Sequence, residues 1–336
     1  MKRFTFLSIA ARSVTALSVA VLSVAALSCL GFFVPVSAQE YPARPVQVLV
    51  GFPPGGSADI VGRLIMQKLS DSTGKQFVVE NRTGAGGNLA FAATATAKAD
   101  GYTLLFSTPG IAINPSLYKK VNFKIEDFTP IALIGEAPLV LLANAKLPIK
   151  TINDLVAMGK TKPDAIRFAS SGNGSSSHLA MDVLRHMTGM QYLHIPYRGG
   201  GPALVDVMSG EVDVTMLPIS ESMPYVRDGR VIALGQTGVT RSTIAKDMPT
   251  IEEAGVKGYA STTWYMVLGP ANLPASVVSY IQKQLSNVLQ IPDLRDKVEA
   301  AGVSIINGDA AKAQAFLDSE YKKWAALIKA SGTVIE

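Results

Sequence analysis

The sequence predicts an α/β fold of two lobes, each a mainly parallel sheet flanked by helices. Short apolar strands alternate with segments whose apolar residues recur at helical spacing, which is the pattern of parallel sheets. The alternation begins twice, after residue 45 and again after residue 150, so two sheets are expected. A late strand near residue 264 indicates a return of the chain to the first lobe. A chain of 336 residues is long enough to build both cores.

The first 38 residues stand apart from this pattern. Their three basic residues are followed by no charged residue until Glu40, and the run between them is small and apolar. Val36-Ser37-Ala38 then offers a small-residue cleavage site. We therefore predict a signal peptide over residues 1–38, cleaved near Ala38, and an exported mature chain. A retained membrane anchor and lipid attachment at Cys29 are the alternatives.

The composition of the mature chain limits its class. Cys29 is the only cysteine and lies in the predicted leader, so the mature chain depends on its core rather than on disulfides. Without the three basic residues of the leader, 28 Lys and Arg remain against 26 Asp and Glu. This near balance gives no argument for a nucleic-acid partner.

The first lobe is expected to alternate strands with two helices. Ile60, Leu64 and Leu69 share one apolar helix face, and the segment after Asn88 is rich in alanine. The expected strands are 46–50, 77–80, 102–106, 131–134 and 139–142, and the expected helices are 59–69 and 88–99.

The second lobe repeats the alternation before the chain returns. Its expected strands are 166–169, 191–195, 212–215 and 231–234, and its helices are 151–160, 179–187 and one that ends at 209. The returning segment is expected to hold strands 264–268 and 303–305 and helices 274–289, 293–301 and 310–330. We therefore assign residues 39–142 and 264–336 to lobe 1 and residues 143–263 to lobe 2.

Three glycine-rich loops follow predicted strands. They are GFPPGGSAD (51–59), NRTGAGGN (81–88) and SSGNGSSSH (170–178). The start of a helix carries unpaired N–H groups and a partial positive charge, and glycine lets an anion approach the backbone closely. Because open parallel sheets bind ligands beyond the carboxyl ends of their strands, two such loops from different lobes would face each other across a cleft. Each loop alone is equally compatible with an ordinary turn and helix cap.

Nucleotide-binding and nucleophile motifs are absent. The pattern G-x-G-x-x-G would need glycine where Leu89 and Ser177 stand, and neither G-x-x-x-x-G-K-[ST] nor G-x-S-x-G occurs. One enzyme alternative is a secreted hydrolase or metal-dependent enzyme that uses His178, Asp182 and His186, whose spacing of four places them on one helix face. The glutamate of H-E-x-x-H is missing there, and a polar helix face explains the same residues.

Seven stretches, taken in order along residues 41–336, carry a specific resemblance. They are YPARPVQVLVGFPPGGSADIVGR, VVENRTGAGGN, DGYTLLF, DFTPIALIG, SSGNGSSSHLA, IPYRGGGPALVDVMSGEVD and MPTIEEAGVKGY. Together they resemble the Bug family of periplasmic solute receptors, the substrate-binding proteins of tripartite tricarboxylate transporters.

The resemblance implies a periplasmic-binding-protein-like fold of type II, with the ligand cleft between two lobes. It implies a monomeric periplasmic receptor without cofactor or metal and not an enzyme. Such a receptor binds a small carboxylate (a di- or tricarboxylate, an amino acid or an aromatic acid) and delivers it to the membrane components of a tripartite tricarboxylate-type transporter. A sensory receptor that signals to a membrane partner through the same cleft is a further alternative.

The resemblance also implies a set of ligand-binding residues, carried over motif by motif. These residues are Phe52, Gly55, Gly56, Ser57, Ala58, Asp59, Thr108, Asn114, Ser171, Gly172, Gly174, Ser175, Ser176, Ser177, Tyr197, Gly199 and Ala203.

The chain departs from the family pattern at four positions. Thr83 replaces a usual proline and Ala90 stands near a common glycine, both away from the two loops that would hold the carboxylate. Pro218 stands where the family often has asparagine, and Met266 where glycine is common. The last two positions are expected to affect the distal half of the pocket and therefore the choice of ligand.

Overall fold

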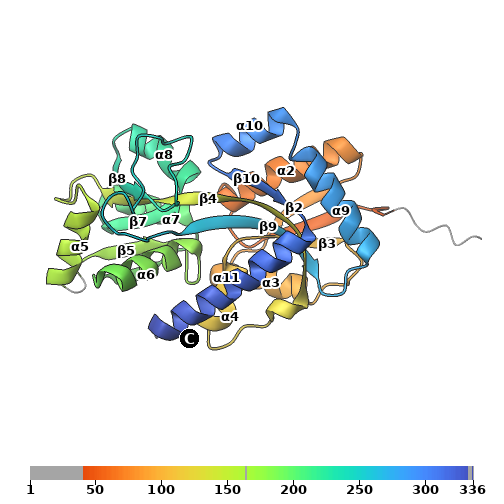
Figure 1. Cartoon of the computed structure of the whole chain (residues 1–336), viewed down its shortest axis with the longest axis horizontal. Coiled ribbons are helices and arrows are strands. Elements are labelled where there is room, and N and C mark those ends of the chain that lie inside the picture. Colours follow the sequence, from red (N-terminus) through yellow and green to blue (C-terminus); the bar gives the residue numbers. More distant parts are fainter. Residues whose placement is uncertain (1–40, 163–164, 332–334, 336) are drawn as a thin grey trace, which may run out of the picture. The chain divides into compact units, whose positions relative to one another are not determined.

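A mixed ten-stranded sheet organises the part of the chain that the structure describes (Figure 1). The computed structural model describes residues 41–162, 165–331 and 335, and the described residues from Pro42 onward form one compact unit. The predicted signal peptide, residues 1–38, lies outside the described residues. Within the described ranges, no helix has both the length and the apolar character that a membrane span needs.

The strands follow one path across the sheet. They are β1 (Val46–Val50), β2 (Phe77–Asn81), β3 (Thr103–Ser107), β4 (Phe128–Asn144), β5 (Arg167–Ser170), β6 (Leu193–Pro196), β7 (Val214–Pro218), β8 (Val231–Gln236), β9 (Thr262–Pro270) and β10 (Ser304–Gly308). Their order is β2-β1-β3-β9-β4-β7-β5-β6, and β8 and β10 also pair with β4. The pairs β1–β2, β1–β3, β5–β6 and β5–β7 are parallel, whereas every pair that includes β4 or β9 is antiparallel.

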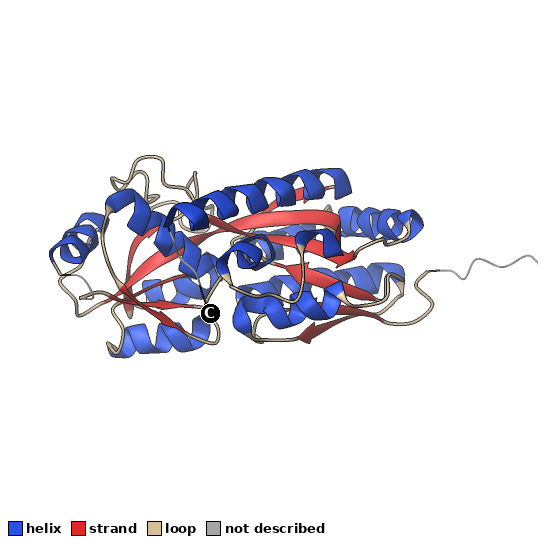
Figure 2. Ribbon diagram, turned by 90° about the horizontal axis from the view of Figure 1, so that it is seen from below, coloured by secondary structure: helices blue, strands red, loops and turns tan. Residues whose placement is uncertain are grey.

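Helices connect the strands and lie on both sides of the sheet (Figure 2). They are α2 (Ser57–Thr73), α3 (Asn88–Ala95), α4 (Gly110–Leu117), α5 (Ile152–Thr161), α6 (Ser176–Thr188), α7 (Gly200–Ser209), α8 (Ile219–Arg227), α9 (Ala275–Val288), α10 (Pro292–Ala300) and α11 (Ala310–Ser331), with 3-10 turns at Ala85–Gly87 and Ile125–Asp127. Both α2 and α6 end at a glycine in the left-handed conformation, Gly74 and Gly189, which is a common helix stop.

The α/β class is confirmed, but two details of the predicted sheets are wrong. Residues 131–134 and 139–142 belong to one strand, β4, whose first half pairs with β9 and β10 and whose second half pairs with β7 and β8. Gly135 does not mark a turn. It lets β10 approach, because a β-carbon there would lie 2.4 Å from the Ser304 carbonyl oxygen. Since β4 and β9 run antiparallel to their neighbours, the sheet is mixed rather than mainly parallel.

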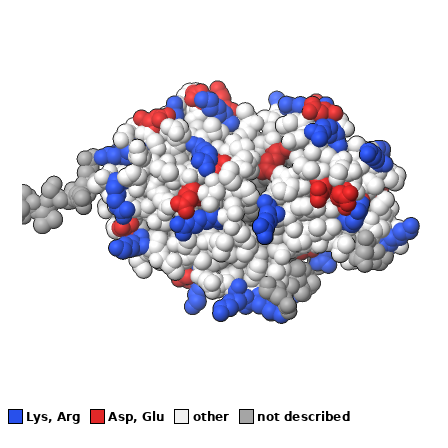
Figure 3. Space-filling model, turned by 180° about the vertical axis from the view of Figure 1, so that it is seen from behind, with Lys and Arg blue, Asp and Glu red and all other residues white. Residues whose placement is uncertain are grey.

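The core lies on both faces of the sheet. In the second half of β4, Leu139 and Leu141 pack in one cluster with α6 residues such as Met181, whereas Val140 and Leu142 pack in another. This alternation is the two-residue period of a strand covered by helices on both sides. A third cluster joins β3, β9 and α11. Basic and acidic side chains are interspersed over the face drawn in Figure 3.

The predicted lobes, residues 39–142 with 264–336 and residues 143–263, stay a prediction. The two boundaries fall inside β4 and β9, which are continuous strands at those positions. β4 contributes to both groups of strands, so it physically links them.

Candidate functional site

The first glycine-rich loop forms the start of α2. Gly55 adopts a left-handed backbone with φ of 81°, which glycine tolerates without strain, and its N–H donates to Asp59 Oδ2 at 3.0 Å. Asn81 braces the same loop because it donates to the Phe52 carbonyl at 2.9 Å and to Asp59 Oδ1 at 2.8 Å. Arg63 also bonds Asp59 Oδ1, at 2.8 Å. Asp59 therefore holds the loop in shape.

The second glycine-rich loop forms the start of α6. Gly172 and Gly174 have φ of 123° and 73°, and Ser175 caps the helix by accepting the His178 N–H at 3.3 Å. The Ser175 hydroxyl itself donates to the Gly172 carbonyl at 2.7 Å, which braces the loop. Next in the chain, Ser176 Oγ bonds Thr263 Oγ1 at 3.2 Å.

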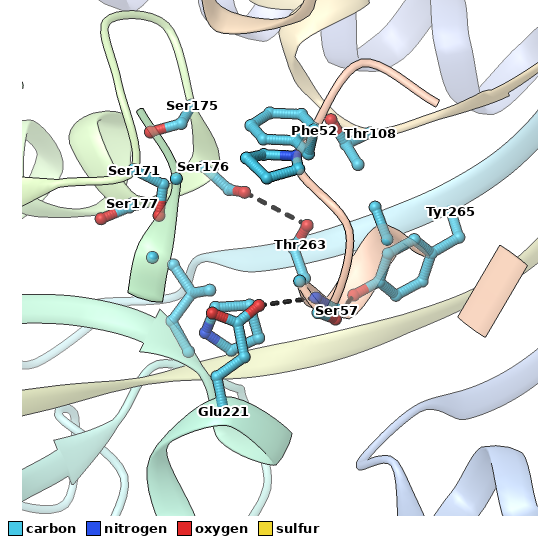
Figure 4. Close-up of a pocket in the computed structure, with 17 residues that line it drawn as sticks. Phe52, Ser57, Thr108, Ser171, Ser175, Ser176, Ser177, Glu221, Thr263 and Tyr265 are labelled. Atoms are coloured by element: carbon cyan, nitrogen blue, oxygen red, sulfur yellow. Dashed lines mark hydrogen bonds between the residues drawn. The ribbon is translucent and has the colours of Figure 1, made fainter. Parts of the chain in front are cut away.

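A cavity of about 50 Å³ lies where the starts of α2 and α6 approach each other (Figure 4). Ten predicted ligand-binding residues line it: Phe52, Gly56, Ser57, Ala58, Thr108, Ser171, Ser175, Ser176, Ser177 and Gly199. Ser177 is 2% exposed, and its hydroxyl has no hydrogen-bond partner among the described residues. A buried hydroxyl without a partner is costly, so this atom is available to a ligand.

Other predicted residues lie outside this cavity. Gly172 and Tyr197 line a neighbouring groove of about 480 Å³, which shares Phe52, Ser171 and Gly199 with the cavity. The Tyr197 hydroxyl bonds Asp206 at 2.6 Å.

Gly55, Asp59, Asn114, Gly174 and Ala203 are not among the residues that line the cavity. Asn114 is fully buried, and its amide donates to the Gly86 carbonyl at 3.2 Å. Gly174 packs against Asn114, and Ala203 belongs to the apolar core.

The cavity also includes residues outside the predicted ligand-binding set, of which the sequence indicated only Pro218, as a position expected to affect the pocket. They are Pro53, Leu139, Gly200, Pro218, Glu221, Thr263 and Tyr265. Glu221 is the only acid among them: its Oε1 accepts the Ser57 N–H at 2.6 Å. Burial raises the pKa of Glu221 to about 7, against the smaller lowering effect of that N–H. In the sequence Glu221 lies between predicted strands 212–215 and 231–234, where no helix is predicted, so nothing there points to a site.

Tyr265 completes this corner of the cavity. Its hydroxyl shares a hydrogen bond with Ser57 Oγ, and its ring stacks on Phe106 with centroids 5.6 Å apart. Burial raises the pKa of Tyr265, so the phenol stays protonated. Pro218, one of the four departures from the family pattern, lines the cavity, whereas Met266 is buried in the core.

Two stacked histidines support the second loop from behind. The rings of His178 and His194 lie 4.0 Å apart and almost parallel. His178 Nδ1 accepts the Gly174 N–H at 3.3 Å, and His194 Nε2 lies 2.6 Å from Ser170 Oγ. Burial lowers the pKa of both rings, that of His194 to about 3, so both are neutral near pH 7. These rings hold the loop.

The metal alternative receives no support from the geometry. His178 Nε2 is 3.7 Å from Asp182 Oδ2, and Asp182 Oδ1 is engaged by Arg185 at 3.0 Å and by Tyr192 at 2.8 Å. His186 lines a separate small pocket beside Trp324. Within the described residues, no three His, Cys, Asp or Glu side chains are grouped as metal ligands.

Comparisons with known proteins identify the family of this chain. The family model described as "Tripartite tricarboxylate transporter family receptor" matches residues 61–333. Protein BugT of Bordetella pertussis is 34% identical over 309 residues, which cover 91% of this chain and 95% of BugT. A protein encoded in the tcbD–tcbE intergenic region of Pseudomonas sp. strain P51 is 33% identical and covers 86% of both chains.

Solved structures show the same fold. An R. palustris protein solved with adipate has a TM-score of 0.83 at 31% identity, covering 87% of this chain and 99% of its own. The periplasmic binding protein BugD has a TM-score of 0.82 at 31% identity, and the match covers 88% of this chain and 100% of BugD. MatC from Rhodopseudomonas palustris with bound malate has a TM-score of 0.79 at 29% identity, and the match covers 86% of this chain and 100% of MatC. The chain therefore belongs to the receptor family of tripartite tricarboxylate transporters, the Bug family of periplasmic solute-binding proteins, as its seven motifs predict.

Proposed function

We propose that this protein binds a small carboxylate in the cavity between α2 and α6 and performs no chemistry on it. The observation that carries the proposal is the meeting of two helix starts at one cavity, whose lining residues include Ser177 with its buried, unpartnered hydroxyl. Helix starts offer free N–H donors and a partial positive charge to an anion. Two family relatives of known structure were solved with adipate and malate, which are both small carboxylates.

The binding energy can come from the backbone and hydroxyl groups. Micromolar affinity needs about 8 kcal/mol. Helix termini contribute about 1–2 kcal/mol each, and hydrogen bonds to a charged carboxylate about 1.5–3 kcal/mol apiece. Burial of the ligand in the cavity between α2 and α6 would supply the rest of the binding free energy. An arginine is not required.

The partner and the location follow from the same proposal. The receptor is exported to the periplasm, loses its leader near Ala38 and works as a monomer without a cofactor. It hands its ligand to the membrane components of a tripartite tricarboxylate-type transporter. Mass spectrometry of the exported chain should give Gln39 as the first residue, and a retained leader would contradict this part of the proposal.

A thermal-shift screen of the mature chain tests the binding function. The panel holds mono-, di- and tricarboxylates, amino acids and aromatic acids, with the matching primary amides and alcohols as uncharged controls. We expect at least one acid to raise the melting temperature while its amide does not. Equal stabilisation by acid and amide, or none by any acid, would overturn the proposal.

A further inference from the structure

We propose that Glu221 selects a ligand that carries an ammonium group at the end opposite its carboxylate. This inference rests on the proposed function and narrows its ligand class. The ammonium group would pair with the Glu221 carboxylate, and the ligand carboxylate would lie at the start of α6. The preferred ligand is therefore a short amino acid with separated charges rather than a dicarboxylate.

Glu221 already occupies one of the two anion-binding helix starts. It is the third residue of α8, and its Oε1 accepts the Ser57 N–H at the start of α2 at 2.6 Å. Its Oε2 lies against Gly200, where a β-carbon would come within 2.3 Å of that oxygen. Gly200 is the first residue of α7, so the carboxylate fits between the starts of α2 and α7. A ligand carboxylate would have to displace it to use Ser57.

The charge of Glu221 has no cationic partner in the part of the chain that the structure describes. Among the described residues, no Lys, Arg or His nitrogen lies within 4.0 Å of its carboxylate. Its polar surroundings are the Ser57 N–H and, beyond it, the Tyr265 hydroxyl, which is neutral. Burial raises the pKa of Glu221 to about 7, and the Ser57 N–H offsets only part of this rise. A carboxylate withdrawn from water without a counter-charge is stabilised most by a cation, and a ligand ammonium would supply one.

The start of α6 is left for the carboxylate of the ligand. It offers the first N–H groups of the helix, and the unpartnered Ser177 hydroxyl lies in its first turn. Figure 4 shows Glu221 beside Ser57 and apart from Ser175 and Ser176. The two ends of the site thus differ in charge preference. In a cavity of about 50 Å³, a second ligand carboxylate would face Glu221 directly and be repelled.

Calorimetry with pairs of ligands that match in length and differ in charge tests the proposal. The pairs are succinate with 3-aminopropanoate, glutarate with 4-aminobutanoate, and adipate with 5-aminopentanoate, so that an ammonium replaces one carboxylate at constant spacing. At pH 8 we expect the amino acid of at least one pair to bind at least tenfold more tightly than its dicarboxylate. Glu221→Gln should abolish this preference. Glu126→Gln removes the same charge from an exposed residue far along the chain and should leave the preference unchanged.

Binding measurements at several pH values test whether the ligand preference depends on the charge of Glu221 or only on its shape. Between pH 8 and pH 6.5 the ligand carboxylates and ammonium groups keep their charges, and Tyr265, the other titratable group beside Ser57, stays neutral. Glu221 gains a proton in this range, so the preference of the wild type should fall toward that of Glu221→Gln.

The outcomes distinguish this inference from the function on which it rests. If dicarboxylates bind at least as tightly as their partners at every length, or if Glu221→Gln leaves the ratio unchanged, the role of Glu221 is overturned and the receptor proposal stands. If no acid in these pairs or in the thermal-shift panel binds, both are overturned.

Discussion

At the scale of single residues, Glu221 should also affect the stability of the free protein. Its pKa of about 7 is raised above the unfolded value of 4.5, so the unfolded state gives up its proton first as the pH rises. Stability is then lost between about pH 4.5 and pH 7 and stays lower above pH 7. Glu221→Gln should therefore stabilise the ligand-free protein by about 1–3 kcal/mol at pH 8, and by much less at pH 5.

Urea unfolding at both pH values measures this difference. Glu126→Gln serves as the control for loss of one charge at an exposed site. If Glu221→Gln raises the free energy of unfolding as much at pH 5 as at pH 8, the stabilisation does not come from removing the buried charge.

Gly56 is the residue whose substitution should most directly block the cavity. Its φ of −75° suits any residue, and a β-carbon there would lie 3.4 Å from the Pro53 carbonyl oxygen and 3.7 Å from Glu221 Oε1. Gly56→Val would therefore fill the start of α2 without backbone strain, and we expect at least a tenfold loss of ligand affinity by calorimetry. Gly201→Val, where a β-carbon meets nothing within 4 Å, should bind normally. Equal affinity of the two variants would place the ligand elsewhere.

The sequence predicted the loop residues of this site better than their partners. Ser57 and Ser175 stand in glycine-rich segments between a strand and a helix, which is a local pattern that sequence reveals. Glu221 and Tyr265 reach the cavity only through long-range packing, 164 and 208 residues away from Ser57. Nothing in their neighbouring sequence distinguishes them from an ordinary helix acid or a buried strand residue.

At the level of secondary-structure elements, the stacked histidines behind the α6 loop should make the folding stability of the protein depend on pH. Burial lowers the pKa of His178 and His194 in the folded protein. Below about pH 6.5 these two histidines therefore bind protons in the unfolded chain but stay neutral in the folded one. Their contribution to stability is therefore lost as the pH falls from 6.5 toward 3. Asp182 and Arg185 also face His178 and act on its pKa in opposite directions.

Replacing His194 with phenylalanine tests this coupling. His194→Phe keeps a ring against His178 but removes a titrating group and the Ser170 hydrogen bond. We expect it to cost about 1 kcal/mol at pH 8 and to lose less stability than the wild type between pH 6.5 and pH 4. Thermal unfolding at several pH values measures the stability cost and its pH dependence. If the stability of the variant falls with pH as steeply as that of the wild type, His194 does not cause the pH dependence.

Two helices escaped prediction for a physical reason. Pro115 lies inside α4 and Pro224 inside α8, and proline in a helix removes a backbone hydrogen bond and argues against helix on local grounds. Both helices are short and are held by packing, with Ile111 and Ile219 fully buried. Tertiary contacts outweigh local propensity here, as they do where β4 continues through Gly135.

At the scale of the whole molecule, the sequence predicted the α/β class but not the pairing of its longest strands. The parallel pairs follow from the local order of strand, helix and strand. The antiparallel pairing of β4 with β9 joins residues near 128–138 to residues near 262–270, and no local signal reports such a distant partner. This pairing matters for function because it brings Thr263 and Tyr265 to the cavity.

A crystal structure of the complex would show whether a small acid binds between the starts of α2 and α6. The crystals would contain the mature protein with the acid that binds most tightly in the thermal-shift panel. We predict one ligand carboxylate within hydrogen-bond distance of the Ser176 and Ser177 N–H groups, with the rest of the ligand extending toward Ser57 and Glu221. A ligand bound away from both helix starts, with the cavity between Ser57 and Ser176 unchanged, would show that these helix starts do not form the binding site.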